Sequence, residues 1–311
     1  SRLDMAEHVQ DTTARVVFAV TYQPARVSLC RTTITSKEIR DMKLHNIFYS
    51  AAMAALAIAL GSCSNIDENE RLIEVEKPQA NRAVLIEDFT GQWCPNCPNA
   101  ADELEQLTET YGSDAIVGVA IHSGPQGFQG GTDDMPGLMT DLGNEYYNHF
   151  GIEYQPQGLV DRGGRLAYSA WAAAVRSELQ KVALMDIHVD NDYSATTRKL
   201  TINTKVKGVK GSGTIANCKL QVWLIEDGIK SIQIMPDGSY NQQYILNHVL
   251  RDAVNGTWGE SVIVTEDADT ENTYTYDIPA NWNADNVSVV AFVYDSNGVQ
   301  QVVKKAIVAK K

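Results

Sequence analysis

The sequence is poor in cysteine, in basic residues and in long apolar segments, and each shortage excludes a class of protein. Five cysteines in 311 residues are too few for the dense disulfide scaffold of a small secreted domain. Lys and Arg number 26 against 39 Asp and Glu, so the net charge of −13 argues against nucleic-acid binding, which needs clustered positive charge. The composition, 44% hydrophobic and 21% charged, is that of a folded chain of about two domains.

One apolar run near the beginning has the features of a signal sequence. It follows the single positive charge of Lys43 and extends from Ile47 to Leu60. Its fourteen residues are too few to cross a bilayer as a helix, but they suit the apolar core of a signal peptide. The pattern therefore predicts an exported protein.

The run ends in Leu60-Gly61-Ser62-Cys63, which resembles a bacterial lipobox. That resemblance implies a lipid on Cys63, with residues 42–62 as the lipoprotein signal peptide and residues 1–41 as sequence upstream of the natural start. An ordinary signal peptide with a chance cysteine is the alternative. Residues 63–80 are polar and acidic, which predicts a tether between the lipid and the folded part.

Residues 81–184 alternate between strand and helix patterns. Apolar, β-branched runs predict buried strands, and apolar residues at helical spacing predict helices that end at glycine. The predicted order is a strand at 83–89, a helix at 97–112, a strand at 114–122, a helix at 135–151, a strand at 157–165 and a helix at 166–182. This order predicts an α/β layer structure.

The texture changes at about Met185. Residues 185–311 contain some seven short segments, several of them alternating, and they are separated by turn residues. This pattern predicts an all-β, Ig-like sandwich domain, with a hairpin turn at 296–298. Residues 239–260 are the least strand-like part and are expected to form a long loop or short helix.

The chemistry of the chain is concentrated in "QWCPNCP", where Cys94 and Cys97 stand two residues apart at the expected start of a helix. Unpaired N–H groups and the positive end of the helix dipole favour a thiolate at that position. Pro98 suits the first helical turn because its missing N–H costs little there. The pair is therefore a candidate redox disulfide, and an inert staple is the alternative.

The segment resembles thioredoxin, in which a strand and a short loop lead into Trp-Cys-x-x-Cys and a helix. The resemblance implies catalytic roles for Cys94 and Cys97, with Asp88 as a buried proton relay and Trp93 beside the disulfide. It also implies a cis Pro156, with Gln155 presenting its backbone to an extended substrate.

Several features depart from that resemblance or offer other interpretations. The dipeptide between the cysteines is Pro-Asn, and residues 124–139 are an insertion. A structural zinc site needs about four ligands, and only His122 is an obvious addition to the two cysteines, so no metal is expected. Cys218 lies on the apolar face of a predicted strand, which indicates a buried, inert thiol. His248, with its neighbours Arg251 and Asp252, is an alternative candidate site.

As a whole the chain resembles the Bacteroidetes outer-membrane lipoprotein family, the 28-kilodalton outer membrane protein family, through Cys63, "EDFTGQWCPNCP" and "NHVLRDAVNGTWGE". The resemblance implies a thioredoxin-like domain before a β-rich domain, anchored in the outer membrane of a Gram-negative bacterium. Two functions follow: thiol–disulfide exchange with a protein or peptide partner, or non-catalytic binding with a structural disulfide. No cofactor is expected beyond the Cys94–Cys97 disulfide.

Overall fold

The structure is a computed structural model that describes residues 82–266 and 268–308. These residues belong to one compact unit, Val75–Lys311. The predicted upstream segment 1–41, signal peptide 42–62, lipidated Cys63 and tether 63–80 lie outside the described residues.

The first half of the unit contains a strand or a helix in each segment where the sequence predicts one, but the helix predicted at 135–151 begins only at Asp141, and the short strands β3, β4 and β6 were not predicted. β1 (Val84–Thr90) and β2 (Ile116–His122) are parallel, and the helix α2 connects them. β5 pairs with β1 in the antiparallel sense, and β6 forms the edge. The remaining bounds are α2 (Cys97–Tyr111), β3 (Gly131–Thr132), β4 (Met135–Pro136), α3 (Asp141–His149), β5 (Gln157–Val160), β6 (Arg165–Ala167), the 3-10 helix η2 (Tyr168–Ala170) and α4 (Trp171–Glu178).

The second half is built from strands and one short 3-10 helix. β7, β8 and β14 form a three-stranded antiparallel sheet, β10 and β11 form a separate hairpin, and β15 and β16 form the hairpin predicted at residues 296–298. The bounds are β7 (Met185–Ser194), β8 (Lys199–Gly208), β9 (Thr214–Glu226), β10 (Ile229–Ile234), β11 (Tyr240–Leu246), β12 (Val249–Ala253), β13 (Glu260–Thr265), β14 (Asp269–Asp277), η3 (Ala284–Asn286), β15 (Val287–Asp295) and β16 (Gly298–Ala306).

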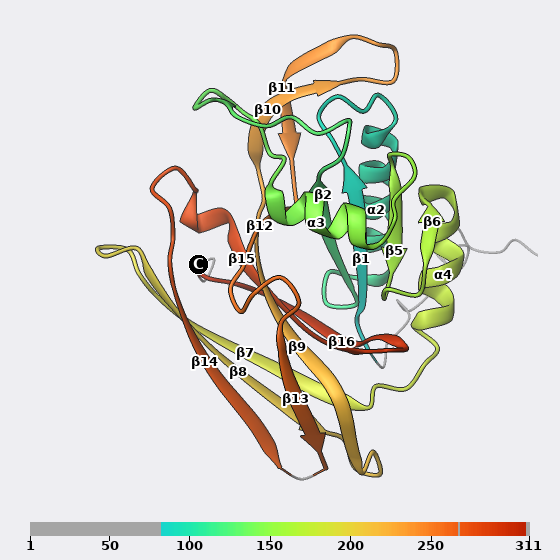
Figure 1. The fold of residues 1–311 in the computed structure, drawn as a ribbon, viewed down its shortest axis with the longest axis vertical. Helices are drawn as coiled ribbons and strands as arrows, with labels where there is room; N and C mark the ends of the chain where they lie inside the picture. The colour runs from blue at the N-terminus through green and yellow to red at the C-terminus, as the bar shows by residue number, and fades with distance from the viewer. Residues whose placement is uncertain (1–81, 267, 309–311) are drawn as a thin grey trace, which may run out of the picture. The chain divides into compact units, whose positions relative to one another are not determined.

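The predicted fold class, an α/β thioredoxin-like domain followed by an all-β Ig-like sandwich, is wrong. The described chain is mostly strand, and strands from both halves form one nine-stranded sheet in the order β16-β15-β9-β12-β2-β1-β5-β6, with β13 paired to β9 (Figure 1). The sheet crosses the point near Met185 where the sequence changes texture. Within residues 82–266 and 268–308 the first half forms no separate α/β domain.

β12 is the strand that joins the two halves. It pairs with β9 on one side, and on the other Val249 is the register partner of Ala120 in β2. It lies inside residues 239–260, which were expected to form a loop or short helix; that prediction is wrong, because β11 and β12 occupy most of the segment. β12 has only five residues and lacks alternation, so its pairing is set by long-range contacts that the local pattern does not record.

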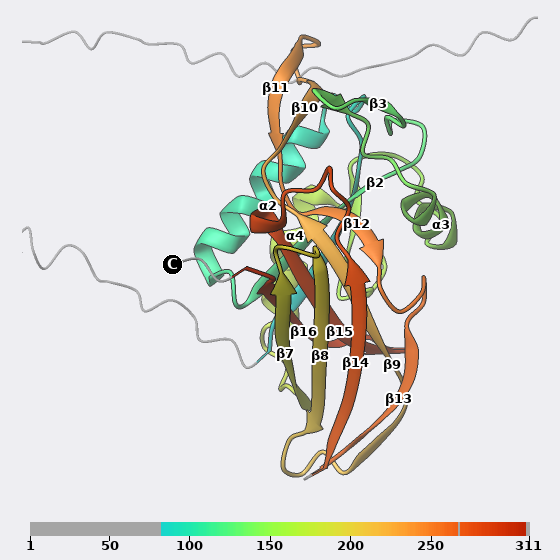
Figure 2. The same ribbon diagram turned by 90° about the vertical axis from the view of Figure 1, so that its left-hand side faces the viewer.

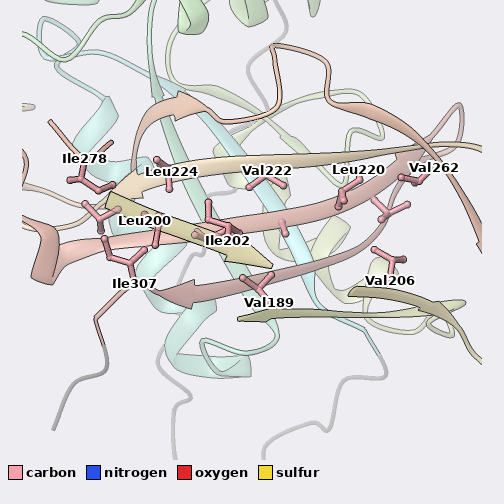
Figure 3. Packing of buried hydrophobic residues seen from close by; sticks show 14 of the residues in the cluster. Val189, Leu200, Ile202, Val206, Leu220, Val222, Leu224, Val262, Ile278 and Ile307 are labelled. Atoms are coloured by element: carbon pink, nitrogen blue, oxygen red, sulfur yellow. The ribbon is translucent and has the colours of Figure 1, made fainter. Parts of the chain in front are cut away.

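Three hydrophobic clusters fill the two faces of the large sheet. One cluster continues across both halves and packs Phe89 of β1 with Phe292 of β15 and Tyr146 of α3. On the opposite face, α2 and α4 cover β1 and β2, while the β7-β8-β14 sheet covers β9 and β15. Figure 3 shows this last contact, with Leu200 and Ile202 facing Val222 and Leu224. α2 and α3 therefore lie on opposite sides of β1 and β2 (Figure 2).

Candidate functional site

Cys94 and Cys97 form a disulfide in the loop between β1 and α2, with Cα atoms 5.4 Å apart. Cys97 is the first residue of α2, and its backbone N–H donates to the carbonyl oxygen of Cys94 at 3.3 Å. Pro98 lies in the first helical turn, as predicted, where no intrahelical partner is needed for its nitrogen. The structure thus places the pair at a helix N-terminus.

Both half-cystines are buried, with Cys94 0% and Cys97 3% exposed. The β10–β11 hairpin lies at the N-terminal end of α2 in both views (Figures 1 and 2). Gln233 of β10 donates from Nε2 to the carbonyl oxygen of Cys94 at 2.9 Å, and the N–H of Ile234 donates to the carbonyl oxygen of Gln92 at 2.9 Å. The hairpin is therefore hydrogen-bonded to the disulfide loop and covers it.

Gln92 and Trp93 attach the same loop to its surroundings. The Gln92 side chain is buried, and its Nε2 donates to Oγ of Ser231 in β10 at 3.0 Å. Its Oε1 accepts from the N–H of Leu138 at 2.9 Å. The half-buried Trp93 ring packs on Phe128, with ring centroids 5.0 Å apart. Residues 124–139, which were predicted to be an insertion, therefore contact the disulfide loop.

Pro156 follows a cis peptide bond, which confirms the conformation predicted for it. It immediately precedes β5, where Gln157 is the register partner of Phe89. The side chain of Gln155 joins three loops: its Nε2 donates to the carbonyl oxygens of Thr90 at 2.6 Å and Ser123 at 2.9 Å. Gln155 therefore has a structural contact that the sequence did not indicate, and its predicted contact with a substrate stays a prediction.

Asp88 is buried on the α2 face of β1 and is 2% exposed. Its Oδ1 has no hydrogen-bond partner among the described residues. Burial raises the pKa of Asp88 from 3.8 to about 7. The carboxyl group therefore stands close to the midpoint of its titration at neutral pH.

His122 ends β2 on the same face, as its register with Thr90 shows, and is also 2% exposed. Neither ring nitrogen has a hydrogen-bond partner within the described part of the chain. Burial, with a smaller effect from the positive charge of Arg251, lowers the pKa of His122 to about 3. The ring is therefore neutral at pH 7, and one of its nitrogens is an acceptor.

Asp88 and His122 line a cavity of about 360 Å³ between α2 and the segment that joins β11 to β12. One face of α2 forms a wall, with residues at positions 97, 101, 104, 105 and 108. The side opposite α2 consists of Tyr244, Leu246 and His248 with their neighbours, and Gln233 lies at the disulfide end. The volume is in the range of small-molecule sites in proteins.

The cavity has an acidic lining. Asp102, Glu105 and Glu109 of α2 join Asp88, and no Lys or Arg is among the lining residues. The pKa of Tyr244 is raised, mainly by burial and also by the negative charges of Asp102, Glu105 and Asp88. These carboxyl groups therefore lie close enough to Tyr244 to influence its pKa together. Negative charge dominates the lining of the cavity.

The other candidate groups do not converge on a second site. Over residues 82–266 and 268–308, no group of three His, Cys, Asp or Glu side chains could hold a metal ion. Cys218 is a buried free thiol on β9, as expected. The His248 segment has separate partners: His248 Nδ1 lies 2.9 Å from Asp227 Oδ1, Arg251 lies 4.8 Å above the Trp282 ring, and Asp252 Oδ2 accepts from Tyr276 at 2.7 Å.

Sequence reasoning missed the roles of His122, Gln233 and Tyr244. His122 was considered as a metal ligand or as a satisfied surface or core histidine, although the parallel alignment of two short apolar runs places it beside Thr90 and near Asp88. Gln233 lies 139 residues from Cys94, and no local signal indicates a contact across that separation. Tyr244 falls in the segment that was expected to be a loop.

The fold is shared with a solved structure. HBP35 of Porphyromonas gingivalis matches 74% of this chain and 77% of its own, with a TM-score of 0.58 and 15% identity, which shows likeness of fold alone. A domain of the outer membrane lipoprotein Omp28 from Porphyromonas gingivalis is 31% identical over 42% of this chain and 93% of its own, with a TM-score of 0.31. A search of the curated proteins found no match.

The described residues define a β-rich protein. The family model of outer membrane protein Omp28 matches residues 143–311, which is more than half of the chain. The chain belongs to the Omp28 family of outer membrane proteins, and the outer membrane is its location. Among the described helices, none has the length and apolar character to cross a membrane.

Proposed function

We propose that this protein is a non-catalytic binding lipoprotein of the outer membrane, in which the Cys94–Cys97 disulfide is structural. The carrying observation is the burial of both half-cystines, 0% and 3% exposed, beneath the β10–β11 hairpin. Thiol–disulfide exchange requires a thiolate to approach a sulfur atom, so access decides the rate as much as thiol pKa does. A sulfur under a hydrogen-bonded hairpin lacks that access.

The binding role rests on the acidic cavity behind the disulfide. Pockets of several hundred Å³ with apolar walls and a few polar groups are the usual sites of small ligands. Here Leu104 and Leu246 supply apolar wall, and Asp88 supplies a buried Oδ1 atom that has no hydrogen-bond partner among the described residues. Buried polar atoms without partners are costly, which favours a bound group that satisfies them.

The lipid anchor belongs to the same proposal and rests on the sequence of residues 60–63, which lie outside the described residues. A lipid on Cys63 would hold the folded unit at the membrane through an acidic tether. Replacement by Cys63→Ser is expected to move the protein from the membrane fraction to the soluble fraction. Mass spectrometry of the N-terminal peptide checks the modification directly, and an unmodified Cys63 in the native protein contradicts this part of the proposal.

Thiol–disulfide exchange with a protein or peptide partner is the second candidate, and one observation favours it. Cys97 and Asp88 line the same cavity, and the pKa of Asp88 is raised to about 7, which suits proton transfer near neutral pH. In that mechanism Cys94 attacks a substrate disulfide, Cys97 resolves the mixed disulfide, and Trp93, cis Pro156 and Gln155 border the substrate. It requires the hairpin to move away from Cys94.

A glutathione redox titration separates the two candidates. A structural disulfide is expected to have a potential below roughly −300 mV, whereas exchange proteins lie at roughly −120 to −270 mV. In parallel, Cys97→Ser is incubated with an unfolded disulfide-bonded protein, and the double variant Cys94→Ser/Cys97→Ser reports the background of the other thiols. A mixed disulfide on Cys94 together with a potential in the exchange range overturns the proposal. A low potential without a trapped species supports it.

A further inference from the structure

We propose that the cavity between α2 and the β11–β12 segment binds a primary alkyl-ammonium group, with Asp88 and His122 as its acceptors. This inference rests on the proposed binding function, because it assigns a ligand class to the same cavity. The shared chemistry is an ammonium group on an apolar stem. Such a group is offered both by free alkyl diamines and by the lysine side chain of a protein.

The floor of the cavity provides acceptors but few donors. Asp88 Oδ1 and both ring nitrogens of His122 are buried and have no hydrogen-bond partner among the described residues. A neutral imidazole offers one acceptor nitrogen, and a carboxylate offers two oxygens. An ammonium group carries three donors and no acceptor, so it can donate to Asp88 Oδ1 and to the acceptor nitrogen of His122, whereas an anion or a carbonyl group offers neither of them a donor.

The charge around the entrance has the sign that a cation requires. Asp102, Glu105 and Glu109 are exposed along one face of α2 and border the cavity. No Lys or Arg is among the lining residues to neutralise them. A cleft lined by one sign of charge concentrates and steers ions of the opposite sign.

The walls suit an aliphatic stem rather than a bare ion. Leu104 of α2 and Leu246 of β11 are buried side chains that line the cavity, and the half-buried Tyr244 lines it with them. An aromatic face also attracts a cation that approaches within about 6 Å of its centroid. A metal ion is a poorer occupant, because the described residues contain no group of three ligating side chains.

The test uses the full chain with its disulfide oxidised and no added thiol, so that its result does not depend on redox activity. Calorimetry measures binding of 1,5-diaminopentane, with 1,5-pentanediol as an uncharged ligand of the same length. A second arm uses an N-acetyl-lysine amide peptide to represent a protein ligand. Binding of either ammonium compound without binding of the diol is expected.

Asp88→Asn is the decisive variant, because it keeps the size of the side chain and removes its charge. Loss of a charge-assisted hydrogen bond is expected to weaken ammonium binding by roughly tenfold or more. Asp192→Asn, the same change on exposed β7, is the matched control and is expected to leave binding unchanged. The rim variant Asp102→Asn/Glu105→Gln, on exposed positions of α2, is expected to weaken binding modestly and to reduce its salt dependence.

The outcomes separate the ligand sources and the two proposals. Binding of the diamine that Asp88→Asn abolishes indicates a free amine, and binding of the lysine peptide alone indicates a protein ligand. Absence of binding by both, or equal binding to Asp88→Asn and the native protein, overturns the inference. Should Asp88→Asn not fold, the rim variant decides, since unaltered binding there excludes this cavity. None of these results depends on whether Cys94 traps a mixed disulfide.

Discussion

Two neighbouring residues of β1, Glu87 and Asp88, are buried carboxyl groups on opposite faces of one strand. Glu87 accepts from Arg162 through three contacts of 3.1 to 3.3 Å. The guanidinium in turn lies over the rings of Tyr294 and Phe292, 4.3 and 4.9 Å from their centroids. Asp88 has none of this: its Oδ1 is unpartnered among the described residues, and a cavity replaces the aromatic packing.

The difference separates a structural carboxyl group from one to which the proposed binding function assigns a role. Glu87 lies between Leu85 and Phe89 on the face of β1 that packs into the cluster continuing across both halves of the large sheet. An unsatisfied charge would be costly there, and Arg162 balances it. Asp88 Oδ1 is buried without a hydrogen-bond partner within residues 82–266 and 268–308, and such an exception in a native fold is explained by a water, an ion, a ligand or a chemical role. The same strand therefore serves packing on one face and, under the proposed function, binding on the other.

The largest effect is expected from removing the partner of Glu87. Arg162→Met leaves a buried carboxyl group without its counter-charge, which is expected to lower the free energy of unfolding by roughly 3–5 kcal/mol. Urea unfolding followed by fluorescence measures the change. The double variant Glu87→Gln/Arg162→Met removes the uncompensated charge and is expected to recover most of the loss. Equal loss in the single and double variants would mean that the aromatic packing of Arg162, rather than the ion pair, stabilises this face.

The opposite sign is expected for Asp88→Asn at neutral to alkaline pH. An unfolded Asp ionises near pH 3.8 and the folded carboxyl group only near 7, so the folded state holds one more proton between these values. The free energy of unfolding of the native protein therefore falls as pH rises through this window. Asn does not titrate. The free energy of unfolding of the variant, relative to that of the native protein, is therefore expected to rise by up to roughly 4 kcal/mol between pH 4 and pH 8.

Urea unfolding of both proteins across this pH range measures that gain, and Asp192→Asn on exposed β7 is the control. The pH dependence of the difference matters more than its absolute value, because the amide also changes the hydrogen bonding of the cavity. A difference that does not vary with pH would show that Asp88 is ionised throughout and has a partner in solution.

The sequence predicts the local features of the disulfide site well. Strand β1, the helix that begins at Cys97 and the buried Cys218 follow from short-range rules of periodicity and capping, whereas the cis bond before Pro156 was implied by the resemblance to thioredoxin. These rules act over a few residues, and they are satisfied in the same way whatever surrounds them. The positions of the site residues near β1 could therefore be predicted from the sequence.

The pairing of strands between the two halves could not be predicted from the sequence. β12 follows His248, which has a left-handed φ of 59°, and its strand pairs connect β9 with β2 across the whole sheet. The β10–β11 hairpin covers the disulfide through Gln233, far away in sequence. Strand pairing of this kind depends on cross-strand and face-to-face packing, so a local pattern cannot specify it.

A smaller loss of stability is expected from removing the Cys94–Cys97 disulfide, whose Cys97 lines the same cavity as Asp88. Cys94 and Cys97 close a very short loop, with a sequence separation of 3, and the chain-entropy argument gives roughly 2 kcal/mol for a loop of this size. The double variant Cys94→Ala/Cys97→Ala is therefore expected to unfold at lower urea but to retain ammonium binding. Loss of binding with an intact fold would instead assign the disulfide a direct role in the cavity.

The smallest effect on stability is expected at the hairpin, where the effect on access is the more informative measurement. Gln233→Ala removes the donor to the carbonyl oxygen of Cys94, which is expected to cost about 1 kcal/mol of stability. Because that contact holds the hairpin over the disulfide, dithiothreitol should reduce the variant several-fold faster, as measured by quenched alkylation and mass spectrometry. Gln242→Ala, on an exposed position of β11, is the matched control. Equal reduction rates in all three proteins would show that the hairpin does not limit access to the disulfide. Thiol–disulfide exchange would then be the better-supported function of this face.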